Sequence, residues 1–387
     1  MPNASAEVDV DSWAVKIPLF LIGIATAAML IIKPVIVGGL MDSFAYSPRE
    51  AGFVAGVEMA GVGLGTLIVV LFGKAWTGRR IVAVGAMIAI LSSIGPSIWS
   101  GFLIVFAFRL CAGLGAGILI SAIIGALAVT RDPDRTFSLY YMASCIAGAF
   151  LFPAGTALTA AHGVRAAYIL LAVLLIPVFL MLRQVPLRRT KARSAETLDR
   201  PFPFRPAAIS LSASVIYWIG TGAIWAFIER MGVADGLPEA EIGAILASSQ
   251  IAFALGALSA SLLHTRIGRA IPAVTGALLS IVAAGIIHMA HGEFGYAAGV
   301  LLYTFAWMFF FPYMTGTMAA QDDAGRIAVL GVPSQTIGLA IGPSIAGYLV
   351  GDGDYGTVIL FGAACYVVTI IVFLPALIGT SRQELEA

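Results

Sequence analysis

The chain has 387 residues, of which 60% are hydrophobic and only 11% are charged, and its mean hydropathy is +0.97. Soluble domains carry about 25% charged residues, so this composition excludes an ordinary soluble enzyme. A net charge of +1 gives no field that would favour nucleic acid as a partner. The three cysteines are scattered in apolar segments and give neither a disulfide framework nor a metal-ligand spacing. We therefore expect an all-α membrane protein that needs no metal and no cofactor.

Apolar segments long enough to cross a bilayer recur along the whole chain. A transmembrane helix needs about 20 predominantly apolar residues. The sequence predicts twelve of them, at about residues 17–41, 50–73, 81–98, 101–129, 138–160, 166–182, 207–231, 240–263, 270–289, 295–318, 328–350 and 356–378. The polar first 15 residues lack the basic region of a signal peptide, so we interpret the first segment as a retained helix.

Lysine and arginine are distributed unequally between the two sides of the predicted bundle. With the N-terminus in the cytoplasm, 17 of the 22 Lys and Arg residues fall in cytoplasmic loops and termini. Only Arg49, Arg165 and Arg230 fall on the outer side, and Lys33 and Arg109 lie within spans. Cytoplasmic loops of membrane proteins carry an excess of these residues. The bias predicts an integral protein of the bacterial cytoplasmic (inner) membrane with both termini in the cytoplasm.

The two halves of the chain repeat one another. The sequence at 51–67 aligns with 242–258 at an offset of 191 residues, with matching small residues. A parallel repeat of six helices is an architecture of secondary carriers, with the substrate site near the bilayer midplane between the halves. We predict an N-terminal six-helix bundle at 1–183, a cytoplasmic linker at 184–206 and a C-terminal six-helix bundle at 207–387, related by pseudo-symmetry.

Two short motifs and one loop resemble a known family. RLCAGLG at 109–115 matches the motif R-x-x-x-G-x-G, and GLAIGP at 338–343 matches the antiporter-like motif G-x-x-x-G-P. The loop AWTGRR at 75–80 stands where the family has D-R-x-G-R-R, with the acid and the first arginine replaced. Together with the twelve spans, these features resemble the major facilitator superfamily over about residues 15–380. The resemblance implies a drug- or organic-solute antiporter-like carrier that works as a monomer by rocker-switch alternating access.

Three ionisable residues lie deep within predicted spans, namely Lys33, Glu58 and Arg109. Each is eight residues from an outer helix end, which is about 12 Å at 1.5 Å per residue. Charges inside a bilayer are expensive and mark functional sites by default. Lys33 and Glu58 lie on neighbouring helices and form either a structural ion pair or a proton-coupling site, in which protonation of Glu58 frees a cation to hold an anion. The planar guanidinium of Arg109 suits bidentate binding of a carboxylate.

The remaining site predictions concern substrate contacts and gating. Aromatic residues on the seventh and tenth helices suggest an apolar cavity wall opposite the cations. The predicted substrate-binding residues are Lys33, Arg109, Gln250, Trp225, Tyr303 and Trp307. The seventh helix is predicted to end near Glu229 and Arg230, which form either a solvated helix end or an outer gate. The predicted gating residues are Glu229, Arg230, Gly338, Gly342 and Pro343.

These features favour a proton-coupled secondary active transporter of a small amphipathic organic solute, an organic or aromatic carboxylate. The alternative is a proton-driven multidrug efflux antiporter for hydrophobic or cationic compounds, and both symport and antiport remain open. Few carboxylates are available to bind sodium, so protons are the favoured coupling ion. No catalytic motif is present, and an enzyme is not expected. The expected partners are the substrate, protons and the lipid bilayer.

Overall fold

The computed structural model describes residues 10–72, 77–183, 185, 202–263, 266–322, 326–351 and 353–386. Within these ranges the chain is helical and contains no β-strand. Twelve spans in the described part of the chain are long and apolar enough to cross a membrane. This confirms the predicted all-α membrane fold. The predicted linker at 184–206 and the first half of the loop at 75–80 lie largely outside the described residues.

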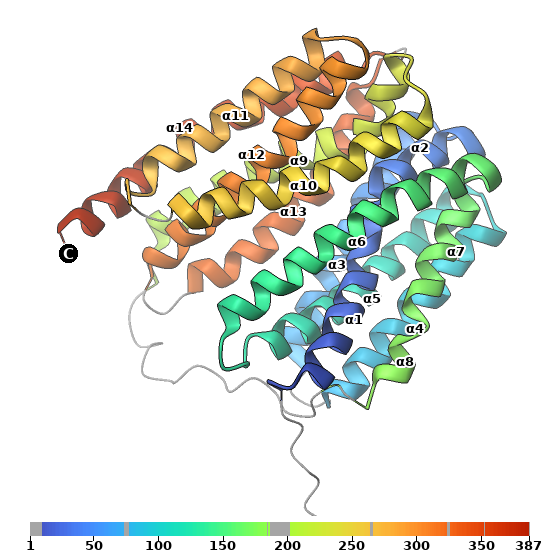
Figure 1. Ribbon diagram of the computed structural model, residues 1–387, viewed down its shortest axis with the longest axis horizontal. Coiled ribbons are helices and arrows are strands. Elements are labelled where there is room, and N and C mark those ends of the chain that lie inside the picture. The colour runs from blue at the N-terminus through green and yellow to red at the C-terminus, as the bar shows by residue number, and fades with distance from the viewer. Residues whose placement is uncertain are drawn as a thin grey trace, which may run out of the picture.

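The first half of the chain forms one six-span bundle, coloured blue to green in Figure 1. Its helices are α1 (Trp13–Ile31), α2 (Lys33–Phe44), α3 (Pro48–Phe72), α4 (Gly78–Ile98), α5 (Phe102–Leu127), α6 (Pro133–His162), α7 (Val164–Leu175) and α8 (Val178–Met181). The first predicted helix is therefore not continuous, because it is divided at Ile32 into α1 and α2. The sixth is likewise interrupted, at Ile176 and Pro177, because proline cannot continue the backbone hydrogen-bond ladder.

The second half forms the other six-span bundle, coloured yellow to red in Figure 1. Its helices are α9 (Phe204–Ala234), α10 (Glu239–Leu263), α11 (Ala270–Met289), α12 (Gly292–Ala320), α13 (Arg326–Leu349) and α14 (Gly356–Glu386). Three of them extend beyond their predicted ends, since α9 continues past residue 231, α12 past residue 318 and α14 past residue 378. The extension of α9 places Glu229 and Arg230 inside the helix rather than at its end.

The division of the first span has a local cause in the sequence. Pro34 has no backbone N–H, so the carbonyl of Leu30, four residues earlier, has no partner within the helix. Ile32 adopts φ −85° and ψ 14°, and α2 starts at Lys33 with the proline in its first turn. Proline is well tolerated in the first turn of a helix because that N–H would be unpaired there. Lys33 consequently stands at a helix break within the apolar span.

The two bundles meet through the helix halves that lie far from the chain termini. We call the end where α1 and α9 begin the proximal end, and the end where α2 and α9 finish the distal end. Three helix pairs make the most extensive contacts between the bundles, namely α3 with α13, α6 with α10 and α2 with α9. At Gly52 and Gly56 on α3, an added Cβ would overlap the backbone oxygens of Pro343 and Ala340 on α13. Small residues thus let the backbones approach closely in the distal half.

Toward the proximal end both of these helices carry exposed apolar side chains. Leu64 and Leu67 on α3 are exposed, as are Val329 and Val332 on α13. The distal part of α3, by contrast, is buried from Ala51 to Met59 at most of its positions. The bundles are therefore closed against each other at the distal end.

Candidate functional site

Lys33, Glu58 and Arg109 come together in one cluster, which we call the buried triad. Glu58 is at its centre: its Oε1 lies 3.3 Å from Nζ of Lys33, and its Oε2 accepts a 2.6 Å hydrogen bond from Nε of Arg109. Nη2 of Arg109 contacts the same Oε2. All three side chains are buried, and Arg109 has no exposed surface. The predicted contact between Lys33 and Glu58 is present, but Arg109 is the closer partner of the carboxylate.

Helix packing brings the three residues together. Lys33 starts α2 at the helix break and also donates a 3.2 Å hydrogen bond to the carbonyl of Ala55, one turn before Glu58 on α3. A Cβ at Gly113 would overlap the carbonyl oxygen of Glu58, so only glycine allows α5 to lie this close to α3. Gly113 lies one turn after Arg109, and the motif at 109–115 therefore supplies both the cation and the close approach.

Arg109 has hydrogen-bonding capacity that the triad leaves unused. Its Nη1 is buried and has no hydrogen-bond partner within the described residues. The guanidinium carbon lies 5.1 Å from the centre of the Tyr168 ring on α7, a cation–π contact. The Tyr168 hydroxyl is also buried and unpartnered. Tyr168 was not predicted from the sequence, because a tyrosine in an apolar helix has no distinguishing pattern.

With all three side chains ionised, the buried triad carries two positive charges and one negative charge. A net charge in a low-dielectric interior is unfavourable unless a counter-ion compensates it. An anion that reached Nη1 of Arg109 or Nζ of Lys33 would remove this imbalance. The triad therefore has the electrostatic and hydrogen-bonding character of an anion site.

A second ionic cluster, which we call the distal cluster, consists of Asp42, Glu229 and Arg230. The Arg230 guanidinium binds Asp42 with two hydrogen bonds, of 2.8 and 2.7 Å, and binds Glu229 with two more, of 2.7 and 2.9 Å. Asp42 belongs to α2 and the other two belong to α9, so this cluster joins the two bundles. Glu229 and Arg230 are buried rather than solvated. Asp42 was not predicted because it lies one residue past the predicted end of the first span.

The predicted aromatic residues also lie together. The Trp307 ring on α12 has edge-on contacts with Trp218, Trp225, Phe253 and Tyr303, with ring centres 5.5 to 6.2 Å apart. All but Phe253 are buried. The Tyr303 hydroxyl donates to the carbonyl of Thr221 on α9 at 2.8 Å. Trp225 also contacts the first bundle, through Phe152 and Leu30.

Gln250 and the glycine–proline motif lie at other helix contacts. Gln250 is on α10, and its amide is close enough to Gly148 on α6 that a Cβ there would lie 2.7 Å from Oε1. Gly338 and Gly342 pack against the α9 backbone, within their own bundle. The carbonyl of Pro343 instead faces Gly52 on α3, across the bundles. Pro343 is therefore the residue of this motif that lies at the contact between the two bundles.

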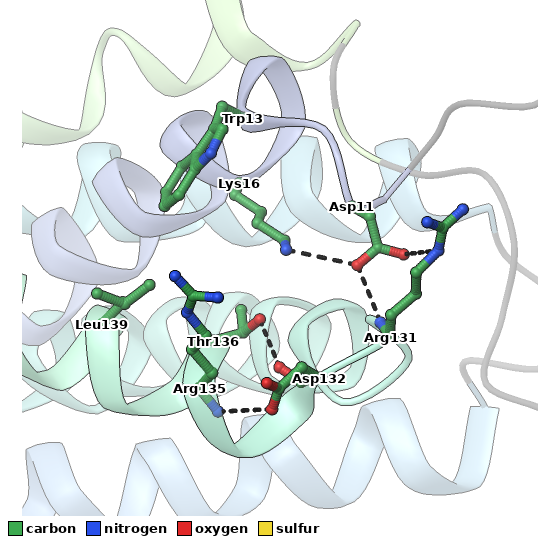
Figure 2. A pocket seen from close by; sticks show the side chains of 8 residues that line it. All are labelled: Asp11, Trp13, Lys16, Arg131, Asp132, Arg135, Thr136 and Leu139. Carbon is green, nitrogen blue, oxygen red and sulfur yellow. Dashed lines mark hydrogen bonds and ion pairs between the residues drawn. The ribbon is translucent and has the colours of Figure 1, made fainter.

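A small cavity of about 210 Å³ lies at the proximal end, between the starts of α1 and α6 (Figure 2). Asp11 accepts a 2.9 Å hydrogen bond from the backbone N–H of Arg131 and lies 3.4 Å from Nζ of Lys16. The backbone hydrogen bond, more than its two cationic neighbours, lowers the pKa of Asp11. Asp132 caps α6 by accepting from the N–H of Arg135 at 3.0 Å. The hydrogen bond and the ion pair between Asp11 and Arg131 attach the segment before α1 to the loop before α6.

Groups of side chains suited to a metal ion are not found in the described ranges. No three or more His, Cys, Asp or Glu residues there gather closely enough to hold one. The charged clusters described above are instead mixtures of acids with lysine or arginine.

Comparisons with known proteins support the fold described above. The profile described as Major Facilitator Superfamily matches residues 19–332. Two crystal structures of the nucleoside transporter NupG, one of them of a point mutant, have TM-scores of 0.75 and 14% identity, and cover 94% of this chain and 98–99% of theirs. A bacterial homologue of the iron transporter ferroportin, in an inward-facing state, has a TM-score of 0.70 and 15% identity, and covers 94% of this chain and 98% of its own. None of the curated proteins matches significantly.

The chain belongs to the Major Facilitator Superfamily, and it is an integral membrane transporter. The family match confirms the predicted resemblance over residues 19–332, which include the motif at 109–115, whereas the motif at 338–343 and the last span lie beyond the matched range. Identities of 14 and 15% to the solved structures support the fold alone.

Proposed function

We propose that this transporter carries a small amphipathic organic solute, an organic or aromatic carboxylate, and couples its movement to protons by rocker-switch alternating access. The proximal end would face the cytoplasm of a bacterium, with the protein in the cytoplasmic membrane as a monomer. Residues 1–183 and 207–387 would move as rigid bundles joined by the linker at 184–206.

The observation that supports this proposal is the excess positive charge of the buried triad, together with the unpartnered Nη1 of Arg109. A substrate carboxylate would bind Arg109 and Lys33 and replace Glu58 as their counter-ion. The aromatic cluster around Trp307 would provide apolar contact for the rest of the solute, with Trp225 and Tyr303 beside it.

Competition for the two cations would couple substrate to protons. When the substrate carboxylate takes Arg109 or Lys33, Glu58 loses a counter-charge, and a carboxyl group without one in an apolar site favours its neutral, protonated form. One proton would therefore accompany one carboxylate, and the triad would keep the same total charge after both have bound. This scheme, in which proton and carboxylate are bound together, corresponds to symport. Antiport would require the proton and the substrate to occupy the triad in turn.

The distal cluster would act as a gate between the bundles. In the closed arrangement Arg230 of the second bundle binds Asp42 of the first. Opening the distal end would separate these two residues, while Glu229 on the same helix would remain beside Arg230 as its counter-ion. Pro343, at the contact with Gly52, would part from α3 in the same movement.

A proton-driven efflux antiporter for hydrophobic or cationic compounds is the second candidate. The large buried aromatic cluster favours it, because aromatic faces also attract organic cations. In that case Glu58 would be the substrate-binding charge, and Arg109 would have to release it.

A thermal-shift screen of the purified protein at pH 5.5 and 7.5 would separate the two candidates. Its panel contains aromatic and aliphatic carboxylates beside cationic drugs, and a ligand that binds the native state raises the melting temperature. We expect stabilisation by carboxylates that Arg109→Lys weakens, because an ammonium group cannot replace the planar two-point contact. Lys16→Gln, which removes a cation from the proximal surface, is the matched control and should leave the shift unchanged. Stabilisation by cationic compounds alone, lost in Glu58→Gln, would establish the efflux candidate instead.

A further inference from the structure

The helix break before Lys33 leaves a polar group that the membrane cannot satisfy. Because Pro34 lacks an N–H, the carbonyl oxygen of Leu30 has no donor four residues ahead. An unpaired backbone carbonyl in an apolar, water-free region is unfavourable, and membrane helices with internal prolines recover a partner from a neighbouring helix. The Leu30 carbonyl therefore needs a hydrogen-bond donor from outside its own helix.

The donor is Trp225, and it comes from the other bundle. Its Nε1 donates a 3.3 Å hydrogen bond to the Leu30 oxygen. Trp225 is 4% exposed, and its ring is held edge-on between Phe152 of α6 and Trp307 of α12, at 6.0 and 5.7 Å. The indole is thus fixed by both bundles and directed at the break in the first span.

A second tryptophan on the same helix provides an internal comparison. Trp218 lies two turns before Trp225, is 1% exposed, and contacts the same Trp307 ring edge-on at 5.6 Å. Its Nε1 is buried but has no hydrogen-bond partner among the described residues. Packing in the aromatic cluster therefore does not require a bonded indole N–H, and the bond of Trp225 reflects its position opposite Leu30.

We propose that Trp225 is a positioning residue whose indole N–H replaces the backbone donor missing at Pro34. The bond fixes the helix break that carries Lys33, and it forms only while the bundles are closed at the distal end. When the bundles separate there, the Leu30 carbonyl loses its partner and Lys33 is released from one of its constraints. The closed state is thereby linked to the geometry of the buried triad. This proposal rests on the alternating access that is part of the proposed function. It does not depend on the identity of the substrate or of the coupling ion.

Spin-label distance measurements on the full-length protein, without substrate, test the proposal. Cysteines at the exposed positions Ala160 on α6 and Ala240 on α10 would report opening of the distal end, in a background with the three native cysteines replaced by alanine. Trp225→Phe keeps the ring but removes the N–H. A typical hydrogen bond is worth about a five-fold change in an equilibrium, so we expect the ratio of open to closed populations to rise about five-fold. Trp218→Phe should leave the ratio unchanged.

Pro34→Ala completes a double-mutant cycle, because it restores a backbone N–H to the Leu30 carbonyl in both states. We expect Pro34→Ala to raise the open population in the same direction, and Trp225→Phe to add little in its presence. The proposal is overturned if Trp225→Phe has its full effect in the Pro34→Ala background, or if Trp218→Phe shifts the ratio equally. If Trp225→Phe does not fold, Pro34→Ala can be measured alone. An unchanged ratio of open to closed populations in Pro34→Ala would then overturn the proposal. Because no ligand is present, a wrong substrate assignment would not affect any of these outcomes.

Discussion

The buried triad and the distal cluster use the same chemistry in different places. In both, an arginine binds a carboxylate through short hydrogen bonds, and a second charge completes the group. The triad lies wholly within the first bundle, whereas the distal cluster links α2 of that bundle to α9 of the other. Arg109 has no exposed surface, but the Asp42 side chain is 55% exposed.

This difference separates two tasks that charges can perform in an alternating-access carrier. If each bundle moves as a rigid body, the movement itself does not break the ion pairs of the triad, and it would reach Lys33 only through the bond from Trp225 to Leu30. In the proposed gate, the pair between Asp42 and Arg230 would break whenever the distal end opens. Because Asp42 is partly in water, that pair is weak enough to be broken and re-formed, whereas an unpaired charge in the triad would be strongly unfavourable.

The largest effect is expected for Glu58→Gln, which leaves Lys33 and Arg109 without a counter-charge. Removing one partner of a buried ion pair typically destabilises a protein by about 3–5 kcal/mol. Proton-driven accumulation in proteoliposomes should be abolished, because glutamine cannot take up a proton, while exchange of internal for external substrate should persist in part. Glu50→Gln, the same change at the partly exposed start of α3, is the control. Loss of both accumulation and exchange would indicate that Glu58 has a structural role only.

The next largest effect concerns Lys33, where the structure changes what we expect. With Lys33 and Glu58 alone as a pair, removing both charges would be milder than removing Lys33. Arg109 instead holds Glu58 at 2.6 Å, so Lys33→Ala leaves a balanced pair and the further change Glu58→Gln leaves Arg109 unpaired. We expect melting temperatures to fall modestly in Lys33→Ala and much further in the double variant. The opposite order would make Lys33, rather than Arg109, the principal partner of Glu58.

The limits of sequence-based prediction follow from the same residues. Membrane length and charge bias are properties of single segments, so the twelve spans and the depth of Lys33, Glu58 and Arg109 can be predicted directly. Which arginine nitrogen reaches which carboxylate oxygen depends on how closely α5 approaches α3 at Gly113, and a sequence does not specify interhelical distance. The hydrogen-bond donor to the Leu30 carbonyl is still harder to predict, because it is the indole of Trp225 in the other bundle. Helix ends are the least reliable part of a sequence-based prediction, so the sequence alone allows a solvated helix end at Glu229 and Arg230 and places Asp42 just outside the first span.

A smaller effect is expected for Asp42→Asn, which weakens the link between bundles without disturbing the triad. Exposed ion pairs contribute about 0.2–1 kcal/mol, so the open population at the distal end should rise by a factor of about 1.4 to 5 in the spin-label measurement. High salt should produce a similar shift in the unmodified protein by screening the pair, and should have little further effect on the variant. An Asp42→Asn variant whose salt dependence matches that of the unmodified protein would exclude this pair as the gate.

The smallest effect is expected at Asp11, whose contacts with Lys16 and Arg131 lie within the first bundle and at its surface. Its pKa is lowered in the folded protein from an ordinary value of 3.8, chiefly by the hydrogen bond from the backbone of Arg131. A depressed carboxyl pKa stabilises the fold above the unfolded-state pKa, and that contribution disappears as the pH falls through the folded-state value. The melting temperature of the unmodified protein should therefore decline slightly more than that of Asp11→Asn below about pH 4. Asp11→Asn and the unmodified protein should show the same distal opening, because the attachment of α1 to the loop before α6 does not cross between the bundles. A change in opening would mean that the proximal end also takes part in the gate.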